Sequence, residues 1–189
     1  MKYTIIEALI SLKPEAEWAV RGGNYSDIVW LDKSQTKPTE QEIEEKIAEL
    51  NYQGEINVYQ EKRKLEYPDW GDQLDKIYHS GIDAWKADIK VIKDKYPKQT
   101  MDATELQKRK DTATFNLQKR NYEKAVARLA QYELSAGLKD EDGKHIIMPI
   151  AVEINGERNP LVVADELEIT EAQEVINNTP QAVIESVSS

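Results

Sequence analysis

Residues 72–96, DQLDKIYHSGIDAWKADIKVIKDKY, contain the clearest helical pattern in the chain. Apolar residues and one glycine recur there at intervals of three and four, the spacing that places side chains on one face of an α-helix. The members of this face are Leu74, Ile77, Tyr78, Gly81, Ile82, Trp85, Ile89 and Ile92. We therefore expect one long helix with a single apolar face along its whole length, and we expect Trp85 to lie in the core.

A second long helix is expected before this stretch. Thr39 is suited to cap it, and Glu42, three residues later, can reach back to the Thr39 amide in a capping box. The helix should run to about Glu66, because Pro68 disfavours helical backbone at the residue before it. A break near Gly54 is possible, since glycine costs about 1 kcal/mol relative to alanine inside a helix.

A third long helix is expected after residue 100. Asp102 can cap it, with Glu105 three residues later, and the helix should continue to Gly137. Its apolar face is thinner than that of residues 72–96, so it offers less surface for packing.

Two short β elements complete the pattern. After a short helix over residues 4–12, apolar and polar residues alternate over 16–20, Gly22-Gly23-Asn24 supplies a turn, and residues 28–31 form a second apolar run. These features predict a small N-terminal hairpin that carries Trp18 and Trp30.

A second hairpin is expected near the C-terminus. Residues 145–154 lead into Asn155-Gly156, a strong turn signal, and then into residues 161–163, while Pro149 places its strand at an edge. Thr170 should cap a last helix over residues 171–178, and residues 186–189 should be loose. A two-stranded hairpin is marginal alone in water, so it must either pack on the helices or add to the sheet edge of a partner. The thin apolar face of the preceding helix favours the partner.

These elements predict a predominantly helical α+β fold, with a small N-terminal β-hairpin, long antiparallel helices, a C-terminal β-hairpin and a short helix. We expect a domain over residues 1–97 and an extension over residues 100–189.

Composition excludes several classes of site. The chain of 189 residues has no cysteine, so disulfides, zinc–thiolate sites and cysteine nucleophiles are impossible.

The charge is distributed unevenly along the chain. Residues 1–99 hold 15 basic and 19 acidic side chains, residues 100–138 hold 7 and 5, and residues 139–189 hold 3 and 11, so the three segments have net charges of −4, +2 and −8. An acidic C-terminal segment is repelled by nucleic acid and by anionic lipid, so we expect a protein partner, with no nucleic acid and no membrane. Glu7 interrupts the first apolar stretch, which argues against a signal peptide.

Candidate catalytic and metal sites have simpler explanations. Asp75, His79 and Asp83 lie four residues apart, but at about 100° per residue they lie to the side of or opposite the apolar face, which favours a solvated surface over a metal site. Gly22-Gly23 lacks the residues of a phosphate-binding loop and is better explained as a turn. With 35 carboxylates, some pair will always match the separation of glycosidase acids, so such a pair carries no information. We therefore expect no catalytic residue, no cofactor and no metal ligand.

The candidate functional residues are instead apolar ones. Trp70 lies in the corner between two predicted helices, where it can cap the corner or face a partner, and large aromatic residues dominate contact hot spots. The β-rich C-terminal runs add further candidates. The predicted protein-interface residues are Trp70, Ile147, Ile150, Val152 and Val162.

The order of short motifs over residues 3–97 resembles the XkdW-like bacteriophage tail-associated proteins. The motifs are WAVRGGNY (residues 18–25), IVW (28–30), KPTE (37–40), a charged helix, Tyr67-Pro68 and GDQLD (71–75), and HSGIDAW (79–85) fits the marine and cyanophage versions of the family. Residues 100–189 depart from the family and match no pattern within it.

The resemblance implies a non-enzymatic structural component of a phage tail, made in the host cytoplasm and present in several copies in the virion, where it binds other tail or fibre proteins. A tail-fibre assembly chaperone that leaves before the virion matures is the alternative. An enzyme acting on host glycans is a third possibility.

Overall fold

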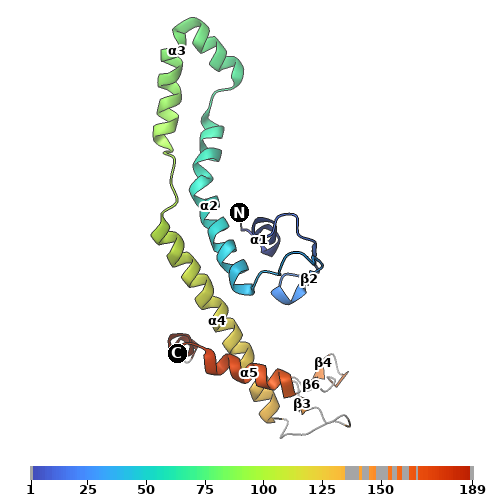
Figure 1. Cartoon of the computed structure of the whole chain (residues 1–189). Helices are drawn as coiled ribbons and strands as arrows, with labels where there is room; N and C mark the ends of the chain where they lie inside the picture. The colour runs from blue at the N-terminus through green and yellow to red at the C-terminus, as the bar shows by residue number, and fades with distance from the viewer. Residues whose placement is uncertain are drawn as a thin grey trace. The chain divides into compact units, whose positions relative to one another are not determined.

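The computed structural model describes residues 2–134, 141, 145–147, 153–154, 157–158, 162–164 and 166–187. The chain divides into two compact units, Met1–Ala113 and Thr114–Ser189. The fold is α+β and predominantly helical, as the sequence predicts (Figure 1). In chain order the elements are α1 (Ile5–Leu12), β1 (Trp18–Val20), the 3₁₀ turn η1 (Tyr25–Asp27), β2 (Ile28–Trp30), α2 (Glu40–Glu66), α3 (Trp70–Lys95), α4 (Ala103–Leu134), β3 (His145–Ile147), β4 (Glu153–Ile154), β5 (Glu157–Arg158), β6 (Val162–Ala164), α5 (Glu166–Asn178) and α6 (Gln181–Val187).

The core of the first unit lies between α1, the β1–β2 hairpin and the start of α2. Ala8, Leu9, Ile28 and Ile43 form its buried cluster. The predicted hairpin is confirmed, with Trp18 opposite Trp30 in an antiparallel pair. Burial of this cluster supplies the main apolar stabilisation of the unit.

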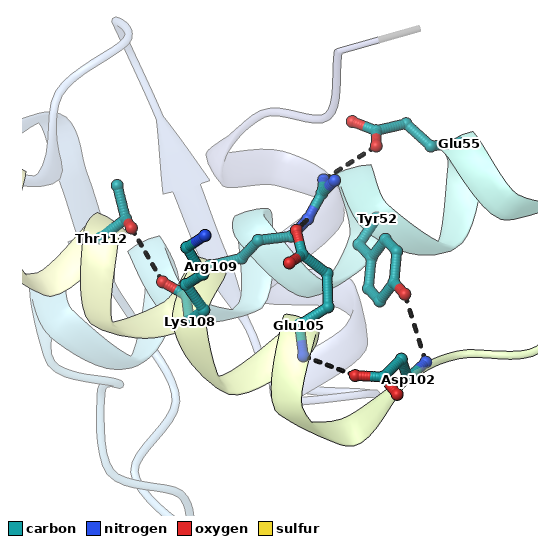
Figure 2. Close-up of polar contacts among 7 residues, drawn as sticks. All are labelled: Tyr52, Glu55, Asp102, Glu105, Lys108, Arg109 and Thr112. Atoms are coloured by element: carbon teal, nitrogen blue, oxygen red, sulfur yellow. Dashed lines mark hydrogen bonds and ion pairs between the residues drawn. The ribbon is translucent and has the colours of Figure 1, made fainter.

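Side-chain caps begin the three long helices. Thr39 and Glu42 form the predicted capping box of α2. Asp69 accepts a hydrogen bond from the Asp72 amide at the start of α3, and Asp102 accepts one from the Glu105 amide at 2.8 Å at the start of α4 (Figure 2). The helix α2 continues through Gly54 without the break that the sequence allowed.

The single continuous face predicted for residues 72–96 is wrong. At Gly81 the backbone is non-helical, with φ 81° and ψ 166°, so α3 folds back on itself as two helical segments, 70–80 and 82–95 (Figure 1). This change of direction turns Leu74 and Tyr78 away from the core, and both are exposed. Trp85 is partly exposed rather than buried, whereas Ile89 is buried.

The two segments of α3 are tied to each other across the turn. Trp85 Nε1 donates a hydrogen bond to Gln73 Oε1 at 3.0 Å, and Lys76 forms an ion pair with Asp88 at 3.0 Å. Gln73 and Lys76 lie on the side of the first segment that contacts the second segment. The other side of the first segment therefore faces solvent.

Polar contacts close the base of α3 against the end of α2. Arg63 donates hydrogen bonds to the carbonyl oxygens of Tyr96 (2.8 Å) and Lys93 (3.1 Å). Glu66 accepts hydrogen bonds from Lys95 Nζ and from the Tyr96 hydroxyl. Both lower the pKa of Glu66, and the hydrogen bond from Lys95 lowers it more. The chain therefore leaves α2 at Glu66 and returns to it at Lys95.

The start of α4 is fastened to α2 by the contacts in Figure 2. The Asp102 amide donates a hydrogen bond to the Tyr52 hydroxyl at 3.2 Å, and the Arg109 guanidinium lies over the Tyr52 ring while pairing with Glu55 at 2.8 Å. The hydrogen bond to Glu105 raises the pKa of Arg109. Because of these contacts, residues 103–113 belong to the first compact unit, and the boundary between units lies inside α4 rather than near residues 97–100.

The second unit contains the remainder of α4 with α5, α6 and two short sheets. Leu117 and Ala125 of α4, Ala172 of α5 and Val183 of α6 are buried. Lys119 Nζ donates a hydrogen bond to the Ser186 carbonyl at 3.1 Å, which joins α4 to α6.

The C-terminal elements differ from the prediction in their extents. The strands on either side of Asn155-Gly156 pair antiparallel as expected, through β4 and β5, and β3 pairs with β6. The last helix was predicted from a Thr170 cap, but α5 begins at Glu166. Residues 186–189 were expected to be loose, whereas Ser186 lies in α6. Pro149, Asn155-Gly156 and the predicted helix end at Gly137 lie outside the described residues.

We predict that Gly81→Ala lowers the free energy of unfolding by about 1–3 kcal/mol, because a Cβ-bearing residue is strained at this φ and ψ. The added Cβ would meet no atom within 4 Å, so a steric clash does not contribute. Chemical denaturation measures the change.

Gly23→Ala is the matched control, since its Cβ also meets nothing within 4 Å and its φ is ordinary. That variant should stay within about 0.5 kcal/mol of the parent. Equal losses in the two variants would show that the backbone at Gly81 carries no special strain.

Candidate protein-binding surface

The structure places three of the five predicted interface residues, and the other two lie outside the described residues. Trp70 is the first residue of α3 and is 77% exposed. Ile147 and Val162 lie opposite each other in the antiparallel pair of β3 and β6, and β6 lies against α5. Ile150 and Val152 lie outside the described residues.

Trp70 belongs to an exposed apolar stripe on the first segment of α3. Leu74 and Tyr78 follow it at intervals of four residues, which keeps the three side chains on one face of the helix. Their exposed fractions are 77% for Trp70, 60% for Leu74 and 84% for Tyr78. We call these three residues the exposed stripe.

The exposed stripe has a fixed orientation. Gln73 donates a hydrogen bond from Nε2 to the Pro68 carbonyl at 2.7 Å and accepts one from Trp85, while Lys76 pairs with Asp88. Because these contacts hold a neighbouring face of the same helical segment, turning the stripe inward would break them. The apolar face is therefore presented outward by the fold.

One carboxylate borders the exposed stripe. Asp75 lies three residues before Tyr78, which places it beside the stripe at about 100° per residue. Asp72, two residues from both Trp70 and Leu74, lies on the opposite side of the helix. The surface is therefore mainly apolar, with Asp75 at its edge.

Sequence reasoning identified Trp70 as an interface residue but placed Leu74 and Tyr78 on the same continuous apolar face as Trp85, which was expected to lie in the core. The missed signal is Gly81, which interrupts an otherwise regular pattern. Gly81 was included in the apolar face because it lies at the three- and four-residue spacing of that face.

Asp75, His79 and Asp83 do not lie on one continuous helix, so their four-residue spacing does not align their side chains. Gly81 breaks the helix between His79 and Asp83, and the His79 ring packs edge-on against Tyr78 with centroids 4.9 Å apart. Among the described residues, no group of three or more histidine and carboxylate side chains is arranged to hold a metal ion.

The Gly22-Gly23 turn surrounds a carboxylate of the chain itself. The Asn24 amide and side chain donate hydrogen bonds to Asp27 Oδ2 at 2.9 and 3.1 Å. A Cβ at Gly22 would approach that same oxygen to 2.2 Å, so glycine is required there for the carboxylate to fit. The turn is thus filled by Asp27.

The described carboxylates with shifted pKa values all shift downward. Hydrogen bonds from Ser34 and Gln35 hold the pKa of Asp32 at about 2, and the hydrogen bond from Lys46 lowers the pKa of Glu49. Hydrogen bonds from Thr4 and Thr39 do the same for Glu7 and Glu42. A glycosidase acid requires the opposite shift, toward a raised pKa.

Comparison with protein-family models, curated proteins and solved structures finds no significant match to this chain. Within the described ranges, every helix is too short or too polar to cross a bilayer.

We predict that Leu74→Ala changes the free energy of unfolding by less than about 0.5 kcal/mol, because an exposed side chain loses little on truncation. Leu9→Ala provides the matched control with the same chemistry at a fully buried position, and it should cost about 2–5 kcal/mol. Chemical denaturation of both variants gives the comparison. A loss at Leu74 as large as that at Leu9 would mean that the stripe packs inside the protein.

Proposed function

We propose that this chain is a non-enzymatic structural component of a bacteriophage tail, and that it binds another tail or fibre protein through the exposed stripe. The observation that carries the proposal is an outward-facing Trp70, Leu74 and Tyr78 on a helix whose neighbouring face is fixed by hydrogen bonds. Tryptophan and tyrosine are enriched in interface hot spots, and an oriented apolar surface is typical of a binding site.

The motif resemblance supplies the tail context of this proposal. Its motifs cover residues 3–97, which include the N-terminal hairpin, the capping box at Thr39 and the Tyr67-Pro68 corner that precedes the stripe. The Trp70-Gly71-Asp72 start of α3 lies within this motif order. The proposed binding surface therefore falls in the part of the chain that carries the resemblance.

The test is quantitative mass spectrometry of purified virions of the phage that encodes the chain. A tail component should be present at a fixed ratio to the known tail proteins, together with co-purification in isolated tails. Presence in the infected-cell lysate with absence from virions would instead identify a tail-fibre assembly chaperone.

A pair of variants links incorporation to the exposed stripe. Leu74→Gln should reduce the copy number in particles by about tenfold, as expected for a hot-spot residue. Val91→Gln, at a 68% exposed position beyond the Gly81 turn, should be incorporated normally. Equal incorporation of both variants would show that the exposed stripe is not the surface through which the chain binds the particle.

A further inference from the structure

We infer that two copies of this chain form a domain-swapped dimer by opening α3 at Gly81. In the single chain, the part after Gly81 packs against the part before it. In the dimer, each part packs against the corresponding part of the other copy. The inference goes beyond the proposed function, because the exchange does not use the exposed stripe.

The connection at Gly81 is unusually short. The segments 70–80 and 82–95 are both helical, and Gly81, with φ 81° and ψ 166°, alone makes the turn between them. Two helices that fold back on each other are ordinarily joined by about two to five residues. A connection of one residue has no slack, and short hinges of this kind favour exchange between copies.

Opening the chain at Gly81 leaves both apolar cores intact. The core of the first unit, formed by Ala8, Leu9, Ile28 and Ile43, lies entirely before Gly81, as do the apolar residues packed against it. The buried residues described in the second unit all follow Gly81. The two parts can therefore separate and exchange without either core being divided.

The contacts that join the two parts can all be made by a second copy. Across the turn, Trp85 donates a hydrogen bond to Gln73, and Lys76 pairs with Asp88. Further contacts join Arg63 to the carbonyls of Lys93 and Tyr96, Glu66 to Lys95, Tyr52 to Asp102, Glu55 to Arg109 and Glu49 to Lys110. Each of these contacts has one member before Gly81 and one after it. They re-form between copies in the exchanged dimer, so only the hinge changes conformation.

The first test measures the dimer dissociation constant of the full-length chain by sedimentation equilibrium. Gly81→Ala should lower this constant at least about tenfold, because alanine is disfavoured at the closed hinge and exchange frees two chains from that conformation at once. Gly23→Ala is the matched control, since its φ is ordinary, and it should leave the constant unchanged.

Lengthening the connection should have the opposite effect. Insertion of a Gly-Ser-Gly tripeptide after Gly81 brings the connection into the usual range of lengths, so the closed single chain becomes easier to form. The dissociation constant should rise at least about tenfold. This variant also tests the hinge if Gly81→Ala does not fold.

A second test distinguishes exchange from any other kind of dimer. Chains that carry Lys76→Cys or Asp88→Cys singly are unfolded and refolded together at high concentration, and the dimer is treated with a short bismaleimide. Because the parent chain has no cysteine, peptide mass spectrometry should identify a link from residue 76 of one copy to residue 88 of the other. The same mixture refolded in dilute solution, where the chain stays monomeric, should give no link.

Three outcomes would overturn the inference. They are monomers of both the parent and Gly81→Ala at every concentration, an insertion variant that dimerises as tightly as the parent, and a dimer without the 76–88 link between copies. A dimer of the last kind that Leu74→Gln dissociates would place a second copy on the exposed stripe instead. Incorporation into virions is measured separately, so the proposed function does not depend on the exchange.

Discussion

The backbone at Gly81 is the constraint on which the arrangement of the first unit depends. Its φ of 81° and ψ of 166° lie in a region that is essentially restricted to glycine. This single residue converts an apolar pattern suited to one straight helix into two segments that pack on each other through Gln73 and Trp85. The return of the chain to α2 at Lys95 and the outward position of the exposed stripe both follow from that turn.

The apolar core and the polar contacts stabilise different parts of the first unit. Ala8, Leu9, Ile28 and Ile43 are buried together near the N-terminus, whereas the end of α3 is joined to the end of α2 by hydrogen bonds from Arg63 and by the ion pair between Glu66 and Lys95. Exposed ion pairs each contribute little, typically below about 1 kcal/mol. A segment held in this way leaves large apolar side chains available, which is consistent with a role in binding.

Local signals in the sequence predicted the starts of α2 and α4 and the N-terminal hairpin. The Thr39 and Glu42 capping box and the Asp102 cap depend only on neighbouring residues, so they could be recognised without knowledge of the fold. The turn at Gly81 could not, because the three- and four-residue spacing continues on both sides of it. As a result, Trp70 was identified as an interface residue while Leu74 and Tyr78 were placed on the same apolar face as Trp85. The start of α5 at Glu166 and the presence of α6 were missed for a related reason: burial of Ala172 and Val183 depends on tertiary packing rather than on local sequence.

The most direct test of this account is whether α3 folds back at Gly81 in solution. The chain has no cysteine, so Lys76→Cys combined with Asp88→Cys gives a unique pair at positions that form an ion pair across the turn. A short bismaleimide, with an arm well under the ~18 Å that separates these positions in an unbroken helix, should link them in high yield. Cleavage after Lys86 would then leave the two fragments joined. Fragments that separate after cleavage, with each cysteine modified singly, would show that α3 is straight and would contradict the account.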